Sequence, residues 1–227
     1  MKIVLNHKCH LTKSEFLKYQ EEFLNIKTSH ELIMCPSNLF VALFSLPEAS
    51  LGVQDVSASE IGSHTGEIAA SQLREMNVEY AIIGHSERRK ENHEDEEIIN
   101  KKIENLILQE ITPILCVGET KEEKEHGKTL EVIKEQLSVL KKHNTKKIII
   151  AYEPVWAIGT GSIPTTEEID TVLEYIKTHF PEATLLYGGS ANETNVTTLK
   201  NSKYIEGYLL GGLSLKQKKL QIFLNLC

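Results

Sequence analysis

The chain has 227 residues, of which 41% are hydrophobic and 25% charged, a composition that excludes disordered and fibrous proteins. The formal net charge of -7 argues against a general nucleic-acid-binding protein, because such proteins present a basic face. An anionic small-molecule substrate stays possible, since a pocket can be locally positive on an acidic protein.

The cysteines and the apolar segments indicate the expected compartment. Cys9, Cys35, Cys116 and Cys227 lie far apart and form no C-x-x-C pair, so we expect neither a zinc site nor a disulfide framework. Free thiols are typical of a reducing compartment. The N-terminal segment becomes polar too early for a signal peptide, and no apolar run approaches the roughly 20 residues that cross a bilayer. We therefore expect a cytoplasmic protein with no membrane partner.

Short apolar or β-branched segments alternate along the chain with segments that carry helical signals. The expected strands are Lys2–Leu5, Glu31–Cys35, Leu51–Val53, Tyr80–Ile83, Thr112–Val117, Lys147–Tyr152, Thr184–Tyr187 and Gly207–Leu210. The sixth is the clearest, because its continuous apolar run is typical of a strand that is covered on both faces in a parallel sheet.

Helix signals lie between these strands. A Thr followed three residues later by a Glu forms a capping box, which predicts helices beginning near Thr12 and near Thr165. Apolar residues spaced three and four apart predict helices over Glu96–Gln109 and Thr129–Leu140. A last helix is expected from about Lys216 to Asn225.

Eight expected strands, each followed by a potential helix, favour an α/β fold of the closed (β/α)8 TIM-barrel type, with residues 1–227 forming a single domain. The third strand is short, and Asp55 to His64 are expected to form a long loop. The rival architecture is an open doubly wound sheet. It is disfavoured because no G-x-G-x-x-G follows the first strand and no later glycines have that spacing.

Such barrels concentrate their chemistry at the carboxyl ends of the strands. Asn6 and Lys8 follow the first strand, although Lys8 alone is better interpreted as a solvated surface charge. His85 follows the fourth strand, beside an expected helix start whose dipole disfavours imidazolium. That motif fits a structural cap equally well, and Arg88 and Arg89 could simply tie loops together through ion pairs.

Glu153 follows the sixth strand, where a carboxylate is costly unless it is paired or used. Pro154 fixes the backbone beyond it. The loop as far as Gly161 begins apolar and ends glycine-rich, which suits a lid that pivots at its ends. The alternative is an ordinary loop with a buried, ion-paired glutamate.

Glycine-rich turns follow the seventh strand (Gly188–Asn192) and the eighth (Gly211–Ser214). Such turns expose backbone N–H groups that can cradle a phosphate with help from a helix N-terminus. Phosphate sites of barrels frequently lie after these two strands. The two turns together therefore predict a phosphate site.

These residues fit the abstraction of a proton next to a carbonyl group. Glu153 would be the base, and His85 and Lys8 would stabilise the charge that develops on the enediolate oxygen. The chain has no metal-ligand set, no cofactor motif and no serine or cysteine with a base beside it. We therefore expect an aldose–ketose isomerisation without metal or cofactor.

Several segments closely resemble the signatures of the triosephosphate isomerase family. They are Tyr80–Arg89 (YAIIGHSERR), Ala151–Gly161 (AYEPVWAIGTG), Leu186–Asn192 (LYGGSAN) and Gly207–Leu215 (GYLLGGLSL), with Asn6–Lys8 and Thr65–Ile68 as shorter matches. The resemblance runs from residue 3 to residue 215. It implies interconversion of dihydroxyacetone phosphate and D-glyceraldehyde 3-phosphate, in glycolysis and gluconeogenesis.

The resemblance also implies roles for individual residues. It makes Glu153 the catalytic base, His85 the electrophile, Lys8 and Asn6 the pair that contacts the substrate, and Glu87 a supporting carboxylate. The implied phosphate-binding positions are Gly159, Ser190, Gly211 and Gly212. The family is usually homodimeric, which would bring the Ser63–Glu67 loop, through Thr65, close to Cys9 of the partner subunit.

This chain departs from the family pattern at two places. His7, Cys9 and His10 replace the Trp, Met and Asn that usually surround the first lysine, so dimer strength and thiol sensitivity are expected to differ. The trailing end of the lid reads Gly161-Ser162-Ile163-Pro164. Because proline restricts the residue before it, we expect a changed opening rate.

Two other functions, a Schiff-base aldolase and a non-catalytic scaffold, fit these residues less well. A Schiff-base aldolase needs a partly buried lysine at a strand end, whereas the sixth strand delivers Glu153 and Lys8 is the only lysine expected in the mouth of the barrel. A non-catalytic scaffold barrel would have no reason to retain this set of acid–base residues.

Overall fold

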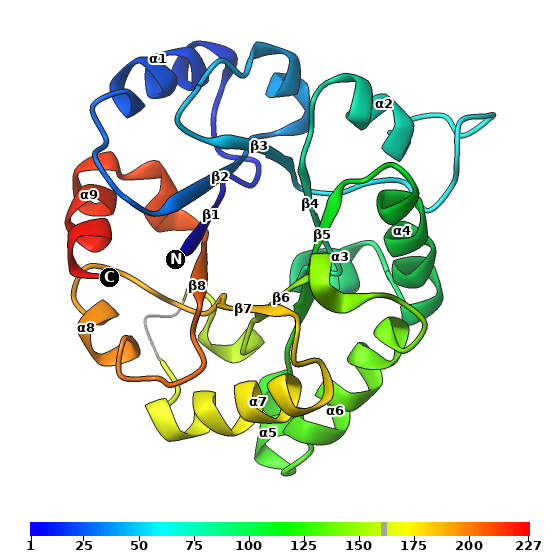
Figure 1. The fold of residues 1–227 in the computed structure, drawn as a ribbon, viewed down its shortest axis with the longest axis vertical. Helices are drawn as coiled ribbons and strands as arrows, with labels where there is room; N and C mark the ends of the chain where they lie inside the picture. The colour runs from blue at the N-terminus through cyan, green and yellow to red at the C-terminus, as the bar shows by residue number, and fades with distance from the viewer. Residues whose placement is uncertain (160–162) are drawn as a thin grey trace.

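The computed structural model describes residues 1–159 and 163–227 and contains a closed barrel of eight parallel strands inside a layer of helices (Figure 1). The strand order around the barrel is the order along the chain, and β8 pairs with β1 to close it. The strands are β1 (Lys2–Asn6), β2 (Glu31–Cys35), β3 (Ser50–Val53), β4 (Tyr80–Ile83), β5 (Thr112–Val117), β6 (Ile149–Tyr152), β7 (Thr184–Tyr187) and β8 (Gly207–Leu210). The expected (β/α)8 fold is confirmed.

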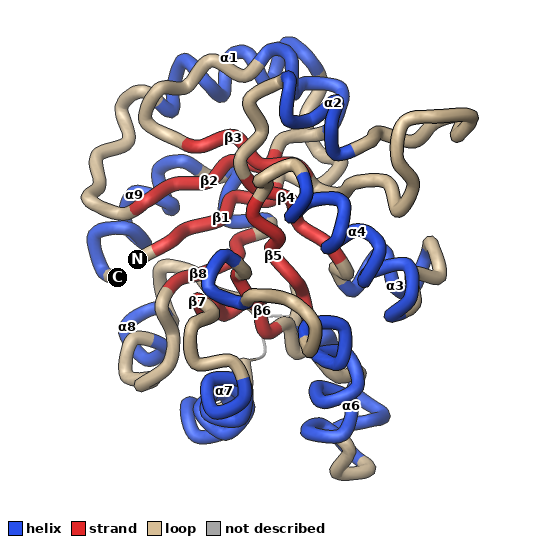
Figure 2. Tube along the Cα trace, turned by 45° about the vertical axis from the view of Figure 1, so that its right-hand side comes forward, coloured by secondary structure: helices blue, strands red, loops and turns tan. Residues whose placement is uncertain are grey.

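The helices of the outer layer vary in length (Figure 2). The α-helices are α1 (Lys13–Phe23), α2 (Ala70–Glu75), α3 (Ser86–Glu91), α4 (Glu96–Leu108), α5 (Lys121–Glu125), α6 (Thr129–Gln136), α7 (Thr166–His179), α8 (Val196–Leu199) and α9 (Gln217–Leu226). The 3-10 turns are η1 (Asn38–Leu43), η2 (Leu137–Leu140), η3 (Thr145–Lys147), η4 (Val155–Ala157) and η5 (Gly212–Leu215).

The structure refines two of the expected boundaries. The helix predicted over Thr129–Leu140 is α-helical only to Gln136 and continues as η2, where Leu137, Val139 and Leu140 are all buried. The tighter 3-10 winding lets these closely spaced apolar residues face the core together. Lys147, expected to begin the sixth strand, belongs instead to η3.

Both predicted capping boxes form. The carboxylates of Glu15 and Glu168 accept hydrogen bonds at 2.8 Å from the backbone N–H groups of Thr12 and Thr165, respectively. Each bond satisfies a donor at the start of its helix, α1 or α7, that has no partner within the helix. The sequence therefore fixes where these two helices begin.

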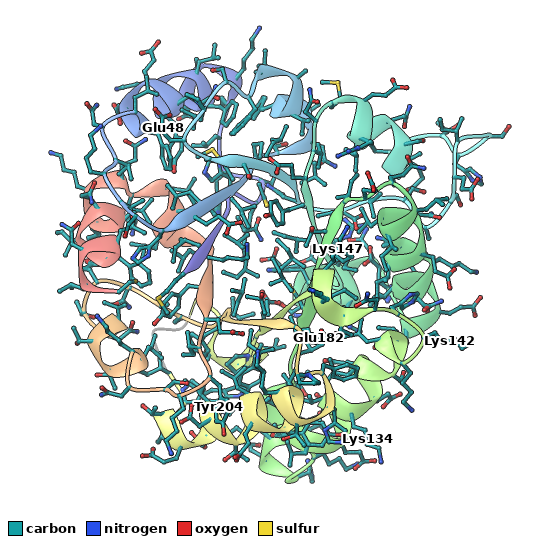
Figure 3. The ribbon with its side chains drawn as sticks, in the orientation of Figure 1. Glu48, Lys134, Lys142, Lys147, Glu182 and Tyr204 are labelled. Atoms are coloured by element: carbon teal, nitrogen blue, oxygen red, sulfur yellow. The ribbon has the colours of Figure 1, made fainter. Side chains whose placement is uncertain are left out.

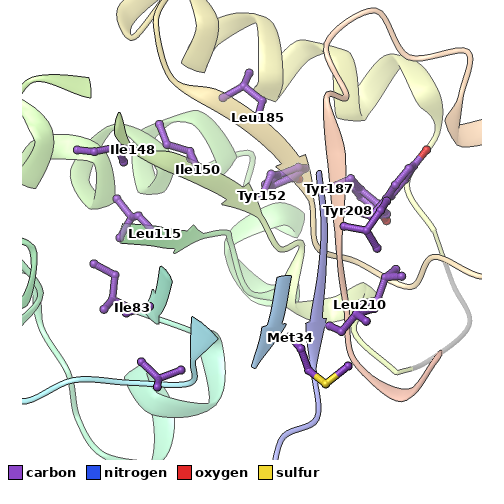
Figure 4. Close-up of a cluster of buried hydrophobic side chains, with 14 of the residues drawn as sticks. Met34, Ile83, Leu115, Ile148, Ile150, Tyr152, Leu185, Tyr187, Tyr208 and Leu210 are labelled. Carbon is purple, nitrogen blue, oxygen red and sulfur yellow. The ribbon is translucent and has the colours of Figure 1, made fainter. Parts of the chain in front are cut away.

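The strands are buried on both faces, which explains their continuous apolar character. One cluster contains only strand residues with barrel-facing side chains, such as Val4, Ile82, Ile149 and Ala151. The alternate residues point outward and form a larger cluster with the helices. Figure 4 shows members of this outer cluster, with Leu185 pointing from β7 toward the helical layer.

The surface of the ring is charged. Lys134 and Lys142 are exposed, and their side chains point outward from the helical layer in Figure 3. The long loop expected after the third strand is confirmed: no helix or strand occurs between residues 54 and 69, and this segment extends away from the ring beside α2 (Figures 1 and 2). Among the described helices, none is long and apolar enough to span a membrane.

Candidate active site

The mouth of the barrel, formed by the carboxyl ends of its strands, is built by strand alternation. Ile149 and Ala151 of β6 face the barrel interior, so Glu153 continues this inward face just past the end of the strand. Asn6 follows Val4 in the same way on β1. On β4, β5, β7 and β8 the corresponding positions are the glycines Gly84, Gly118, Gly188 and Gly211. The mouth of the barrel is therefore lined by the polar side chains of Asn6 and Glu153 after β1 and β6, and by glycine backbone after β4, β5, β7 and β8.

Glu153 and His85 meet in this space. Their side chains are 3% and 6% exposed, and His85 Nε2 lies 3.3 Å from Glu153 Oε1. The backbone N–H of Ser86 donates a second, long hydrogen bond of 3.4 Å to Glu153 Oε2. The carboxylate is thus buried, with contacts that are longer than those of a tight charge-assisted pair.

His85 is the N-cap of α3, and this position determines which of its nitrogens carries the proton. Its Nδ1 accepts a hydrogen bond of 3.2 Å from the backbone N–H of Glu87, so Nδ1 has no hydrogen of its own. The ring is then neutral, with its proton on Nε2, the nitrogen that faces Glu153. The structural cap and the neutral donor, which the sequence left as alternatives, are therefore compatible uses of one side chain.

Lys8 is held at the mouth from two sides. Its backbone adopts a left-handed conformation (φ 50°), and its N–H donates to Asn6 Oδ1 at 3.0 Å. Its Nζ lies 2.5 Å from Glu87 Oε1. Burial acts to raise the pKa of the Glu87 carboxyl, but the hydrogen bond from Lys8, together with the electrostatic effects of neighbouring basic side chains, outweighs it and holds the pKa below its ordinary value. Glu87 therefore anchors the lysine as a carboxylate.

One cavity of about 460 Å³ joins the predicted residues. It is lined by Asn6, Lys8, His85, Glu153, Gly159, Ser190, Gly211 and Gly212. Glu87 lies outside it, in a neighbouring hollow of about 300 Å³. The structure thus brings together every expected site residue except Glu87, which reaches the cavity through Lys8.

Two glycines shape the surroundings of Glu153: Gly188, which begins one of the predicted phosphate turns, and Gly118, which sequence reasoning did not assign to the site. A Cβ at Gly188 would lie 2.7 Å from Glu153 Cγ, and one at Gly118 would lie 1.8 Å from the Glu153 carbonyl oxygen. A side chain at either position would push the glutamate out of place. Both follow strand ends, which was the signal available in the sequence.

The loop after β6 is anchored at its leading end. Trp156 in η4 donates from Nε1 to Glu119 Oε1 at 2.8 Å, and Lys124 lies over the indole ring at 3.7 Å. Ser190 Oγ donates to the Ala157 carbonyl at 2.5 Å, which ties this loop to the turn after β7. The trailing hinge expected at Gly161 and Ser162 lies outside the described residues.

Glu119, which anchors Trp156, was missed by sequence reasoning. Its carboxylate is buried and also accepts hydrogen bonds from the Tyr152 hydroxyl. Burial raises the pKa of this carboxyl, and the hydrogen bonds from Trp156 and Tyr152 oppose the rise. An acidic residue just past an apolar strand was the signal that singled out Glu153, and it applies to Glu119 as well.

The expectation that Lys8 is the only lysine in the mouth is wrong. Lys216 and Lys219 also line the cavity, because η5 turns the chain immediately after β8 and α9 begins beside the phosphate turns. The sequence places both lysines several residues beyond the glycine pair, so their direction could not be seen. Both are exposed, and neither is the partly buried lysine that a Schiff base requires.

A closed barrel with a buried carboxylate, a neutral histidine, a lysine and glycine-lined turns in one cavity defines the class of phosphate-binding barrel enzymes that move protons. The family model described as triosephosphate isomerase matches residues 1–227. The chain belongs to the triosephosphate isomerase family and is an isomerase.

Relatives from several bacteria carry the same name, triosephosphate isomerase. The protein of Mycoplasmopsis agalactiae is 46% identical over 77% of this chain and 69% of its own length. That of Dictyoglomus thermophilum is 40% identical over 94% of each chain. That of Alkaliphilus oremlandii is 37% identical over 88% of this chain and 87% of its own.

Proposed function

We propose that this isomerase interconverts dihydroxyacetone phosphate and D-glyceraldehyde 3-phosphate. The observation that carries the proposal is the contact of 3.3 Å between Glu153 and His85 in a cavity shared with the glycine turns after β7 and β8. Membership of the family supports the same substrate pair.

The geometry suggests one role for each side chain. Glu153 removes a proton from the carbon next to the carbonyl group, and electrons shift to the carbonyl oxygen to form an enediolate. The neutral His85 donates from Nε2 toward that oxygen, and Lys8 supplies a positive charge. The proton of the neighbouring hydroxyl group passes by way of His85 Nε2 to the former carbonyl oxygen, and Glu153 returns its own proton to the neighbouring carbon, which completes the isomerisation.

The phosphate end is proposed to lie on the turns after β7 and β8. Gly212 is the first residue of η5, so its N–H has no partner within that turn, and a Cβ there would meet nothing within 4 Å. Ser190 and Gly211 border the same space, and Gly159 does so from the loop after β6. Asn6, whose Oδ1 accepts a hydrogen bond from the Lys8 N–H, is also proposed to contact the substrate.

The direct test is the initial rate of conversion of glyceraldehyde 3-phosphate, followed with a coupled dehydrogenase in metal-free buffer. A fast rate that survives a chelator is the expected outcome, because each role is filled by a side chain. Absence of turnover by folded protein would favour the scaffold function, and trapping of a substrate adduct by borohydride would favour an aldolase.

We also propose that the chain, as one (β/α)8 unit, forms a homodimer. The segment 54–69 extends from the ring with Ile61 71% exposed, and the hollow beside Lys8 is lined by Cys9, Asn38 and Glu91. An exposed extension with Ile61 in it and a hollow on the same chain suit a self-complementary interface. A sedimentation experiment should give twice the mass of the chain, and Thr65→Arg should give a monomer. A monomeric wild type would remove this proposal.

The proposed location is the cytoplasm. A place in glycolysis and gluconeogenesis supports it, as do four cysteines without disulfides. Fractionation of cells that express the full chain is the test, and activity confined to another compartment would contradict the proposal.

A further inference from the structure

The cavity continues beyond the phosphate turns to an ion pair on its rim. Glu193, in the segment between β7 and α8, meets Lys219, in the first turns of α9, with 2.5 Å between Oε1 and Nζ. The Glu193 side chain is 16% exposed, and both residues line the active-site cavity. The pair therefore bridges the two chain segments that follow the two glycine turns.

The backbone around Glu193 is held in place by hydrogen bonds within its own loop. Asn192 Oδ1 accepts a hydrogen bond from the Thr194 N–H at 2.8 Å, and Asn195 Nδ2 donates to the Ser190 carbonyl at 2.8 Å. These bonds fix the backbone on both sides of Glu193 to the turn that carries Ser190. A negative charge is thus built into the wall of a cavity proposed to receive a phosphate.

Such a charge opposes the binding of an anion unless it is compensated. The hydrogen bond from Lys219 is the main cause that holds the pKa of Glu193 below its ordinary value, and the charge of Lys216 contributes, so Glu193 is ionised at neutral pH. At this end of the cavity Glu193 contributes one negative charge, and Lys219 and Lys216 contribute one positive charge each. These three charges sum to one positive charge; Lys8, whose Nζ would lie 3.9 Å from a Cβ at Gly211, is paired separately with Glu87.

We propose that Glu193 and Lys219 are positioning residues that set the affinity for the substrate phosphate: Lys219 cancels Glu193 and leaves Lys216 as the net cation beside the phosphate turns. The inference rests on the proposed phosphate site at Ser190, Gly211 and Gly212. It assigns a charge balance to side chains that contact neither the reacting carbons nor Glu153.

A purely structural role would give a different pattern. If the pair only cross-linked the β7 turn to α9, loss of either partner would weaken the site in the same direction. If charge balance is the function, the two single variants act in opposite directions. Lys219→Ala leaves a local sum of zero, whereas Glu193→Ala leaves two positive charges.

The experiment measures the KM for glyceraldehyde 3-phosphate and the inhibition constant of inorganic phosphate at low ionic strength. For Lys219→Ala we expect both constants to rise about threefold to tenfold, the size of one charge lost several ångströms from a dianion near solvent. For Glu193→Ala we expect both to fall, and for the double variant to return close to wild type. Lys218→Ala is the matched control, because Lys218 is a neighbouring exposed lysine of α9 that does not line the cavity.

Ionic strength provides a second readout. The differences between the single variants should shrink as salt is added, because these charges are accessible to solvent. Equal losses in both single variants, an effect of Lys218→Ala as large as that of Lys219→Ala, or no effect of Lys219→Ala would each overturn the inference. Thermal melting of every variant checks that the fold is retained, and Glu193→Gln and Lys219→Gln serve in place of any alanine variant that fails this check.

Gly212→Asp separates this inference from the proposed phosphate site. It places a carboxylate on the turn itself and should raise the KM through repulsion and blocked amides. If Gly212→Asp raises the KM and Lys219→Ala does not, the phosphate site stands and only the charge balance falls. If neither changes the KM, the phosphate binds elsewhere.

Discussion

Two groups of buried charged side chains in this molecule are partnered in opposite ways. Beneath the loops that follow β3 and β4, Lys102 Nζ lies 2.6 Å from both Glu94 and Asp55, and Arg88 lies 2.5 Å from Glu94 and 2.7 Å from Asp55. At the mouth, Glu153 is as deeply buried, but its contacts with His85 and the Ser86 N–H are 3.3 and 3.4 Å.

The difference separates a structural cluster from the carboxylate that is proposed as the base, Glu153. Short charge-assisted bonds pair each charged group of the cluster with a group of opposite charge, although Glu94 Oε2 has no partner among the described residues, and these bonds fix α4 against the loops. A base must keep its charge and retain an oxygen that can take up a proton, which long contacts with neutral donors permit. Burial alone therefore does not distinguish a structural charge from a proposed base. The number and the lengths of the hydrogen bonds and ion pairs that the charged group makes do distinguish them.

The largest expected effect comes from replacing Glu153, the proposed base. Glu153→Gln keeps the size and the hydrogen-bonding capacity of the side chain but removes the base, so we expect turnover to fall roughly 10²- to 10⁴-fold. Inhibition by inorganic phosphate should change little, because the phosphate turns are untouched. Steady-state kinetics measures the first and competition assays the second. Unchanged turnover would remove Glu153 from the mechanism.

Breaking the cluster should affect stability rather than chemistry. Lys102→Met leaves Glu94 and Asp55 without their buried cation. Burial already raises the pKa of Asp55 and the charge of Lys102 opposes this, so the variant loses an important compensation. We expect a loss of about 3–5 kcal/mol in the free energy of unfolding.

The matched control for this change is Lys101→Met. Lys101 is the preceding residue of α4, and it forms an exposed pair with Glu97 on the surface of the same helix. Its loss should change stability much less than the loss of Lys102, because water screens an exposed pair. Denaturant unfolding measures both variants, and equal effects would show that the buried cluster contributes no more than a surface pair.

A buried group without any partner sharpens the comparison. His7 lies between Asn6 and Lys8, its ring is packed edge-to-face on Tyr19 at 4.6 Å, and neither ring nitrogen has a partner among the described residues. Burial, with the nearby charge of His10, lowers the pKa of His7 from 6.5 to about 4. Below 6.5 the unfolded chain binds a proton that the folded chain does not, so stability falls as the pH decreases from about 6.5 to about 4.

His7→Phe should remove this dependence while keeping the aromatic contact. At about pH 7 the free energies of unfolding of the variant and the wild type differ by some amount. When the pH is lowered to about 4.5, that difference should shift by about 2–3 kcal/mol in favour of the variant. Denaturant titrations at the two pH values provide the measurement. The same difference at both pH values would mean that His7 is not held neutral by burial.

The smallest expected effect concerns the ion pair between Lys8 and Glu87 at the mouth of the barrel. Glu87→Gln weakens the anchor of Lys8, but Glu87 is 49% exposed and such pairs contribute up to about 1 kcal/mol. We expect kcat/KM to fall no more than about fivefold. A loss as large as that of Glu153→Gln would instead give Glu87 a direct catalytic role.

The sequence by itself determined the order and type of most elements. Alternating apolar strands and capped helices are local patterns, and the rule that useful residues follow strand ends selected Glu153, His85, Lys8 and Asn6 as candidates, which line one cavity. The glycine pairs after β7 and β8 were visible for the same reason. These features depend on neighbours within a few positions, which the sequence shows directly.

Only the tertiary structure decided which distant residues meet. His85 and Glu153, which are in contact, are 68 positions apart in the sequence. Lys219 reaches Glu193, in the segment between β7 and α8, from α9. The clash that a Cβ at Gly188 would make with Glu153 depends on closure of the barrel. The direction of a side chain beyond a turn is set by packing, so no local pattern could place Lys216 and Lys219 in the cavity.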